Sequence, residues 1–232
     1  MKILGLDTSG KTASVAILEY GENTTLLGEH TVYTSRTQSQ VIMPMCKNLL
    51  EECRLTLKEI DCIAVSVGPG SYTGLRIGIA AVQGMAMVNN TPCKGISTLA
   101  GMACRVYGEN PVLSIMYARG NLFYYGIYED NLEGFYCVHS DRLAEIQEII
   151  EVIQNYEKII IVGDGTDEFL RQSASISKES FPCISYPPQI LRLQSAAGVC
   201  LYAAYEQNFE TASDLTASYL QAVQIQKKKT DL

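Results

Sequence analysis

A glycine-rich loop holds the residues best placed to do chemistry. The apolar run Cys62–Val67 ends in Gly68-Pro69-Gly70, and an apparent helix follows, with Ser71 or Thr73 as its cap and Arg76 in its first turns. Free backbone N–H groups and the helix dipole at such an N-terminus favour phosphate and other anions. The loop therefore predicts an anion site, although the G-x-x-x-x-G-K-[ST] pattern of a P-loop is absent. The alternative interpretation is a tight turn whose small residues pack within the chain.

The helix after this loop carries three glycines. Gly74, Gly78 and Gly84 each cost roughly 1 kcal/mol relative to alanine in a helix interior, so each needs a compensating reason. One face of the helix has i, i+4, i+7 and i+11 spacing and consists of Gly74, Gly78, Ala81 and Met85. We expect this face to meet a helix of another subunit. The competing interpretation is that it faces this chain's own sheet.

The segments around the loop give a β-β-β-α-β-α order. Apolar runs separated by polar turns predict strands over Lys2–Leu6, Thr12–Glu19 and Thr24–Tyr33. A 3.6-residue apolar stripe then predicts a helix, which can contain Pro44 only near its start. That stripe includes Val41, Met45 and Leu49. Strand Cys62–Val67, the glycine-bearing helix to about Val88 and a helix over Thr98–Tyr107 complete the order.

The second half of the chain repeats this order. At an offset of 110 residues, Leu6 is answered by Met116, and at an offset of 95, Val67-Gly68-Pro69-Gly70 is answered by Val162-Gly163-Asp164-Gly165. Two coincidences in the same order indicate a structural duplication, with subdomains 1–109 and 110–232. Helices are expected over Arg142–Gln154 and Gln194–Asn208, and the second is expected to pack back onto the first subdomain.

Composition and charge favour a globular protein without membrane contacts. The 232 residues are 47% hydrophobic, which is enough for a substantial core. Asp7 interrupts the first apolar run too soon for a signal peptide, and Ile77–Val88 is too short to span a bilayer, so we expect a cytoplasmic location. The net charge of −7 argues against a large autonomous nucleic-acid surface. Lys227-Lys228-Lys229 predicts a solvated tail or a weak contact to RNA or a partner.

Cysteine and histidine usage favours neither a disulfide framework nor a metal site. The eight cysteines form no C-x-x-C pair, which indicates reduced, buried thiols. The two histidines, His30 and His139, lie in apparent strands without a second histidine at ligand spacing, so a zinc site is not expected. No serine–histidine or cysteine–histidine pair is readable as a nucleophile and its base.

The segment Val65–Gly78 closely resembles the GPGSFTGxRIG segment of the TsaB (YeaZ) family, with Tyr72 where phenylalanine is usual. That family is the non-catalytic partner of the enzyme that makes N6-threonylcarbamoyladenosine in tRNA. The duplicated β-β-β-α-β-α plan is that of the actin-like ATPase (ASKHA, RNase H-like) superfamily. The resemblance thus implies an α/β actin-like fold, with a truncated second half.

The superfamily's phosphate-binding turns are altered in this chain. The superfamily has an Asp-x-Gly turn in each half, and here the turns are Asp7-Thr8-Ser9 and Tyr117-Ala118-Arg119. Ser9 replaces a glycine, and Tyr117 offers no carboxylate for Mg²⁺. Phosphoryl transfer depends on positioning the phosphates and on neutralising their charge with the metal, so both changes count against it. Asp7 is left to orient its turn by accepting backbone N–H bonds. Two other departures from the family pattern are Gln38-Ser39-Gln40, where His-Ser-Glu is usual, and Gln221, where arginine is usual.

The resemblance implies a scaffold with no active site and no cofactor of its own. It would dimerise with itself or with a TsaD-type paralogue, which carries the metal-binding histidine pair that this chain lacks. It further implies a TsaE-type ATPase as third component, ADP or ATP near the subunit junction, and tRNA met only through the complex. The residues expected beside the nucleotide or another anion are Asp7, Ser9, Gly68, Gly70, Ser71 and Arg76. The expected subunit interface consists of Val41, Met45, Leu49, Tyr72, Gly74, Leu75, Gly78, Ala81 and Met85.

Two other classes of function stay open at this point. One is a stand-alone actin-like ATP-dependent kinase or glycoprotease-like peptidase, against which Ser9, Tyr117 and the missing histidine pair count. The other is a free-standing RNA-binding module, against which the acidic balance counts.

Overall fold

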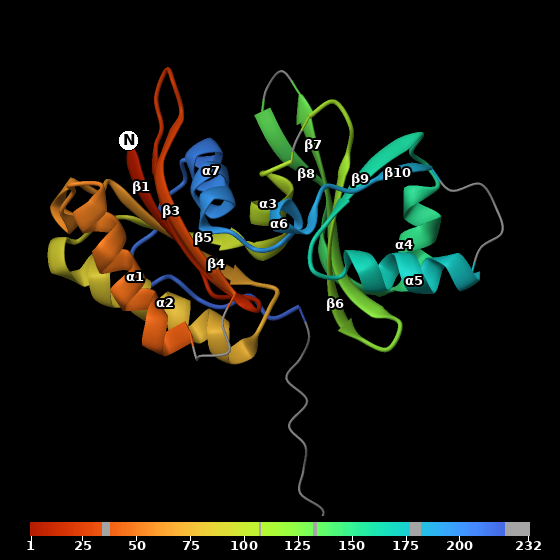
Figure 1. The fold of residues 1–232 in the computed structure, drawn as a ribbon, viewed down its shortest axis with the longest axis horizontal. Helices are drawn as coiled ribbons and strands as arrows, with labels where there is room; N and C mark the ends of the chain where they lie inside the picture. The colour runs from red at the N-terminus through yellow and green to blue at the C-terminus, as the bar shows by residue number, and fades with distance from the viewer. Residues whose placement is uncertain (34–37, 107, 132–133, 177–181, 221–232) are drawn as a thin grey trace, which may run out of the picture.

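Two five-stranded mixed sheets lie side by side in the computed structural model, which describes residues 1–33, 38–106, 108–131, 134–176 and 182–220 (Figure 1). The first sheet has the order β3-β2-β1-β4-β5, where β1 is antiparallel to β2 and parallel to β4. Its strands are β1 (Lys2–Asp7), β2 (Thr12–Glu19), β3 (Thr25–Tyr33), β4 (Cys62–Gly68) and β5 (Cys93–Ser97).

The second sheet repeats the plan of the first. Its order is β10-β9-β6-β7-β8, with β6 antiparallel to β7 and parallel to β9. Read from the other edge, this is the same order as in the first sheet, so the predicted duplication is confirmed. The second copy is truncated at one edge, where its last strand has 3 residues and that of the first copy has 5. Its strands are β6 (Val112–Arg119), β7 (Leu122–Asn131), β8 (Gly134–Glu145), β9 (Lys158–Val162) and β10 (Cys183–Ser185).

Helices cover both faces of the first sheet, and the alternation of β1 shows why. Successive side chains of a strand point to opposite faces. Leu4 and Leu6 therefore pack with α1 (Gln38–Glu52) and α2 (Tyr72–Asn89), whereas Ile3 packs with α3 (Thr98–Ala103) and α7 (Ala196–Glu206). The second sheet is covered by α4 (Ile146–Ile153) and α5 (Thr166–Ile176). The remaining short helices are the 3-10 helix η1 (Leu57–Glu59) and α6 (Gln189–Arg192).

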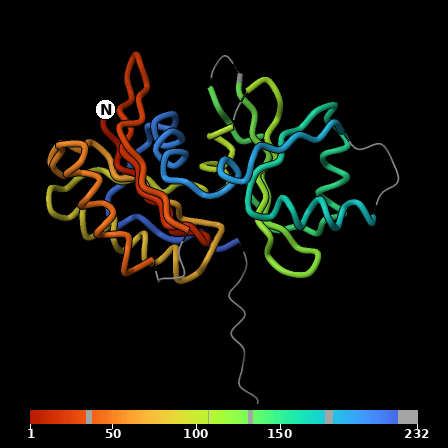
Figure 2. Tube along the Cα trace, viewed as in Figure 1, coloured from red at the N-terminus to blue at the C-terminus, as the bar shows by residue number. Residues whose placement is uncertain are grey.

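The last helix returns to the first sheet. Figure 2 traces the chain from the second sheet back to α7, which contacts β1, β2 and α3. The core on this side also contains Met116, Tyr128 and Phe135 of the second sheet, so one apolar cluster joins the two halves. Burial of this shared cluster makes the two halves depend on each other for stability.

Several element boundaries differ from the sequence expectation. Strand β5 was not anticipated, and the helix expected over Thr98–Tyr107 is described only to Ala103, with Tyr107 outside the described residues. The first residues of the expected helix Arg142–Gln154 belong to β8, where they pair with β7. Pro44 lies well inside α1 rather than near its start, and its exposed position lets the helix continue on the buried side.

The prediction of buried thiols holds for only part of the cysteines. All eight are free, and five are buried, but Cys53 is half-buried and Cys137 and Cys183 are exposed. His30 lies in β3 and His139 in β8. Among the described residues, no helix combines the length and the apolar character needed to cross a membrane.

The crossing of α3 and α7 predicts an asymmetric response to alanine. A Cβ at Gly198 would lie 2.0 Å from the Gly101 carbonyl oxygen, whereas a Cβ at Gly101 would meet its first neighbour, Val199, at 3.5 Å. Gly198→Ala should therefore cost about 1–3 kcal/mol of unfolding free energy through overpacking. Gly101→Ala is the matched control and should be neutral or stabilising. Urea unfolding of both variants measures this, and equal loss in both would contradict the packing described.

Candidate functional site

Asp7 is sealed inside the protein at the end of β1. Its carboxylate accepts hydrogen bonds from the Ser9 backbone N–H at 2.9 Å, the Ser9 hydroxyl at 2.7 Å and the Ser66 hydroxyl at 2.5 Å. Burial raises the pKa of Asp7, and the hydrogen bonds from Ser66 and Ser9 only partly offset this. The bond from the Ser9 N–H confirms that Asp7 orients its own turn. With 2% of its surface exposed, the carboxylate does not reach solvent or a ligand.

The glycine-rich loop is bound to that same turn. The Ser71 N–H donates to the Ser9 carbonyl oxygen at 2.7 Å, and a Cβ on Gly70 would lie 2.5 Å from that oxygen. Ser71 is the N-cap of α2, as predicted, and its hydroxyl accepts from the Gly74 N–H at 3.2 Å. Two N–H groups that an anion would use are thus already engaged. The anion site predicted at this loop stays a prediction with fewer available donors.

Gly74 and Gly78 face this chain's own β1–β2 turn. A Cβ on Gly74 would lie 2.0 Å from the Thr8 carbonyl oxygen, and one on Gly78 would lie 2.4 Å from the Thr8 hydroxyl. The Thr8 hydroxyl also donates to the Gly74 carbonyl oxygen at 2.7 Å. The expectation that this glycine face lies between subunits is therefore wrong. A large residue at Gly78 would disrupt the fold of the single chain.

Four of the other seven expected interface residues also belong to the interior. Met45, Leu49, Leu75 and Met85 are buried within the chain. Val41 and Ala81 are half-buried, and Tyr72 is exposed. The reason is physical, since an apolar stripe at helical spacing is first of all the face that a helix packs on its own sheet.

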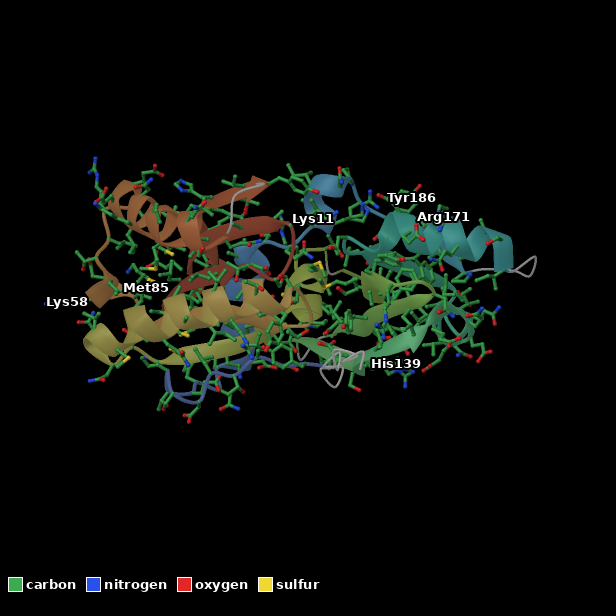
Figure 3. All side chains as sticks on the ribbon, turned by 90° about the horizontal axis from the view of Figure 1, so that it is seen from below. Lys11, Lys58, Met85, His139, Arg171 and Tyr186 are labelled. Carbon is green, nitrogen blue, oxygen red and sulfur yellow. The ribbon has the colours of Figure 1, made fainter. Side chains whose placement is uncertain are left out.

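Between the two sheets, the described residues Lys11, Asp164 and Gln194 help to line a small cavity. This cavity holds about 90 Å³, against about 300–1,000 Å³ for small-molecule and cofactor sites. The Gln194 side chain packs so closely on Gly10 that a Cβ there would lie 2.6 Å from it. Gln194 also donates to Asp164 at 3.3 Å, so it joins the turn of the first half to the second. Figure 3 shows Lys11, which also lines the cavity, at the junction of the two halves.

Acidic and basic groups around the cleft are paired with protein groups. Burial raises the pKa of Asp164, while the bond from Gln194 and the charge of Lys11 lower it. Arg192 donates to Asp167 at 2.8 Å. Among the described residues, no three His, Cys, Asp or Glu side chains are grouped so that they could hold a metal ion. The arrangement binds the two halves together, and it leaves little room for a nucleotide between them.

The residues that depart from the family pattern lie at separate places. Tyr117 is exposed at the end of β6, with its ring against Phe123 at 5.5 Å between centroids. The Gln38 side chain donates to the Gly10 carbonyl oxygen at 3.0 Å, so this substitution supports the β1–β2 turn. Gln221 and the Lys227–Lys229 run lie outside the described residues.

Arg76 belongs to an exposed aromatic cluster and not to the cleft. Its guanidinium lies 4.0 Å from the centre of the Tyr72 ring, and its Nε donates to the Tyr219 hydroxyl at 3.0 Å. The two tyrosine rings stack at 5.1 Å. This cluster attaches the end of the described chain to the first turns of α2 through a cation–π contact and a hydrogen bond.

Gln194 and Asp164 lie at the cleft but were not among the site residues predicted from the sequence. Asp164 carried a signal, because the repeat places it opposite Pro69 in the glycine-rich loop. Gln194 carried none, since its role depends on the path of the chain between α6 and α7.

Two mixed sheets of the same strand order, each with helices packed on it, define a duplicated α/β protein of the actin-like type. The sequence model of the TsaD family, described as tRNA N6-adenosine threonylcarbamoyltransferase, matches residues 30–227. The chain belongs to the TsaB (YeaZ) family of tRNA threonylcarbamoyladenosine biosynthesis.

The individual relatives agree with this assignment. The tRNA threonylcarbamoyladenosine biosynthesis protein TsaB of Buchnera aphidicola subsp. Schizaphis graminum is 32% identical over 181 residues, covering 74% of this chain and 82% of that protein. The TsaB of Escherichia coli K12 is 34% identical over 139 residues, 59% of this chain and 58% of that one. The solved structure of YeaZ from Pseudomonas aeruginosa has a TM-score of 0.76 at 26% identity, covering 94% and 99% of the two chains.

The buried Asp7 predicts a pH-dependent penalty on stability. Folding raises the pKa of Asp7, so the native state favours the protonated form of this carboxyl group. The contribution of Asp7 to the free energy of unfolding therefore falls as the pH rises above its unfolded pKa of about 4. Asp7→Asn should therefore become more stable relative to wild type as the pH rises from about 4, as measured by urea unfolding. Asp7→Ala should lose about 1–3 kcal/mol because the Ser9 and Ser66 hydroxyls lose their acceptor. Parallel pH profiles for wild type and Asp7→Asn would show that burial does not shift this group.

Proposed function

We propose that this protein is a non-catalytic subunit that supports threonylcarbamoyl transfer to tRNA by a TsaD-type enzyme. The observation that carries the proposal is the closed cleft. Asp7 is buried under the hydroxyls of Ser9 and Ser66, and Gln194 fills the space beside Gly10. A phosphoryl-transfer enzyme of this fold needs a carboxylate and a phosphate path in that place. The activity would therefore reside in the partner, and this chain would supply structure.

The outer faces of α1 and α2 are the surface that we assign to subunit contact. The two helices contact each other and lie together on the first sheet (Figure 1). Met87 and Val88 are 75% and 70% exposed, and Met43 of α1 is 45% exposed. Met87 and Val88 adjoin each other in the sequence, and exposed apolar side chains that lie together are typical of protein interaction sites.

The exposed glycine Gly84 also supports subunit contact at this face. Among the described residues, a Cβ at Gly84 would meet nothing within 4 Å, so their packing gives no reason for this helix glycine. Its cost of roughly 1 kcal/mol relative to alanine is therefore not compensated by a contact with the described part of the chain. Ala80 and Gly84 lie one turn apart on the exposed side, which lets a helix of another subunit approach closely. The interface face is thus the one opposite to the face expected from the sequence.

The assembly that we propose has few requirements. A TsaD-type paralogue or a second copy of this chain covers the α1–α2 face, and a TsaE-type ATPase is the third component. ADP or ATP lies near the subunit junction and not in the filled cleft. The net charge of −7 suits a subunit that meets tRNA only through its partner, in the cytoplasm.

The rival function is a stand-alone kinase or peptidase. It would require the cleft to open and Asp7 to give up its three hydrogen bonds. Breaking the hydrogen bonds of a buried carboxyl group is costly in free energy. Steady ATP or peptide turnover by the purified chain, abolished by Asp7→Ala, would establish this rival.

Reconstitution tests the proposed function directly. Adding the protein to a TsaD-type enzyme, a TsaE-type ATPase, threonylcarbamoyl-adenylate and tRNA should raise the yield of modified adenosine, measured by nucleoside mass spectrometry. The chain alone should give none. If the yield stays at the level without the protein over a range of ratios, the accessory role is wrong.

Substitution at Gly84 tests the proposed surface. Gly84→Leu should weaken association roughly five- to 150-fold, because overpacking commonly costs about 1–3 kcal/mol. The midpoint temperature of thermal unfolding of the monomer should not fall, since leucine is a better helix former than glycine. Gln147→Leu, at an exposed position of α4, is the matched control and should leave association unchanged. Sedimentation that shows equal affinity for Gly84→Leu and wild type would exclude this face.

A further inference from the structure

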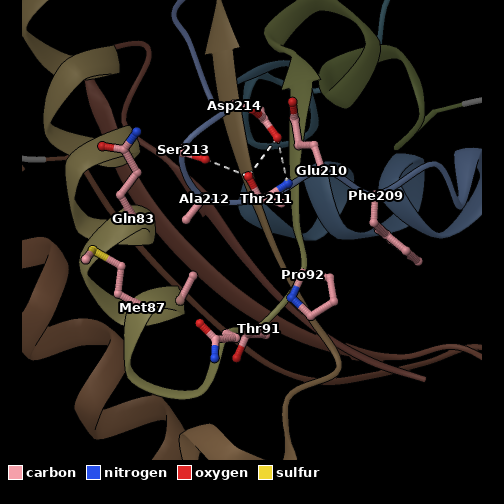
Figure 4. Close-up of a pocket in the computed structure, with 12 residues that line it drawn as sticks. Gln83, Met87, Thr91, Pro92, Phe209, Glu210, Thr211, Ala212, Ser213 and Asp214 are labelled. Carbon is pink, nitrogen blue, oxygen red and sulfur yellow. Dashed lines mark hydrogen bonds between the residues drawn. The ribbon is translucent and has the colours of Figure 1, made fainter.

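A groove runs along α2, between that helix and residues 209–219, which we name the C-terminal strap. Its larger cavity, of about 900 Å³, lies at the C-terminal end of α2, and a second of about 340 Å³ lies nearer the N-terminal end. Gln83 lines both cavities and donates to the Leu215 carbonyl oxygen at 3.3 Å. Figure 4 shows the larger cavity, with α2 residues on one side and strap residues on the other.

The strap is a fixed wall of this groove. Glu210 exchanges two backbone hydrogen bonds with Cys93 of β5, and its carboxylate accepts from the Gly95 N–H at 2.8 Å. Leu215 is buried in the core beneath α2, and the Ser218 N–H donates to the Val67 carbonyl oxygen at 2.8 Å. Because the wall is held at both ends, a ligand meets a preformed surface and loses little free energy in ordering it.

The groove is lined by apolar and polar residues, and one end carries two carboxylates. Met87 and Phe209 are exposed in the larger cavity, 75% and 37% respectively. Glu210 and Asp214 line the same cavity, and the negative end of the α2 dipole is directed there. None of the described residues that line the larger cavity is a lysine or arginine. The complementary ligand has apolar side chains followed by positive charges.

The sequence after the strap has this chemistry. Residues 221–232 read QAVQIQKKKTDL, in which Val223 and Ile225 alternate with glutamines and are followed by Lys227-Lys228-Lys229. In an extended chain such alternation places the two apolar side chains on the same side. These residues lie outside the described part of the chain, and the strap that precedes them ends near Tyr219.

The length of this segment matches the groove. Tyr219 is held at Arg76, near the start of α2, by the 3.0 Å hydrogen bond. Met87 lies about 17 Å further along the helix at 1.5 Å per residue. Lys227 lies within about 27 Å of Tyr219 at roughly 3.3 Å per residue, which leaves enough chain for a turn. The lysines therefore reach the end of the groove that carries Asp214.

We propose that residues 221–232 bind in the α2 groove of the same chain, with Val223 and Ile225 against the apolar lining and the lysines at the acidic end. The bound segment lies beside Gly84 and Met87 and competes with a partner for the α1–α2 face. The binding itself does not depend on the proposed function, and its test requires no partner enzyme.

A labelled peptide tests the proposal in trans. We compare the full chain with a variant that ends at Leu220 and keeps every described element, using a fluorescein-labelled peptide of residues 221–232. The shortened chain should bind the peptide with a Kd below about 1 mM, because a short tether gives an effective concentration of that order. The full chain should bind it at least several-fold more weakly, since its own segment occupies the groove. Equal affinity for both chains, or no binding at 1 mM, would overturn the proposal.

Matched variants locate the contact. Met87→Ala in the shortened chain should weaken peptide binding roughly five- to tenfold, because Met87 lines the groove. Val88→Ala, at a neighbouring exposed position outside the lining, should leave it unchanged. A peptide with Lys227, Lys228 and Lys229 changed to Glu should not bind, and added salt should weaken the native peptide. Equal binding of both peptides would refute the charge complementarity.

Amide NMR spectra show whether the segment in the groove belongs to the same chain or to a second copy, or whether the groove is empty of it. Differences between the full and shortened chains should map to α2 and the strap and should not change with protein concentration. Differences that grow with concentration would assign the groove to the segment of a second copy. Differences confined to the residues next to Leu220 would show that the groove is not occupied by this segment. Either result would replace the intrachain contact proposed here.

Discussion

The approach of Thr8 to α2 is the contact on which the first half depends. Thr8 meets the helix at two glycines, and only hydrogen atoms at those positions allow the spacing seen. The same turn holds Asp7 below it and accepts the Ser71 N–H beside it. Strand β1, the glycine-rich loop and the start of α2 thus share one point of contact. A displacement at any of them would expose a buried carboxylate, which makes the arrangement cooperative.

The sequence was informative wherever a local pattern had a local cause. Three strands, the duplication and the cap at Ser71 follow from apolar periodicity and turn residues, and these were predicted correctly. The face of α2 was not. Gly74 and Gly78 announce a close approach, but a glycine pattern does not say whether the neighbouring group comes from the same chain or from another. Only the position of Thr8 in three dimensions decides this.

Candidate site residues were harder to predict than the fold. The repeat showed that Tyr117 stands where the superfamily has a carboxylate, because the equivalent turn of the first half could be identified in the sequence. The closing of the cleft could not be read, because Gln194 lies far in sequence from Gly10 and belongs to an irregular connection. Strand β5 was missed for a related reason. It has one lysine and one glycine among its five residues, and tertiary pairing with β4 outweighs its weak strand propensity.

The position of α7 has a consequence for how the protein forms in the cell. This helix shares with α3 the face of the first sheet that carries Ile3, and its Cys200 thiol donates to the Ile3 carbonyl oxygen across a separation of 197 residues. During synthesis, the part of this apolar face that α7 covers stays open until α7 has been made. The contact between β1 and α7 therefore closes a very long loop, which is slow and entropically costly. The nascent protein is consequently exposed to aggregation or chaperone binding until α7 has been synthesised.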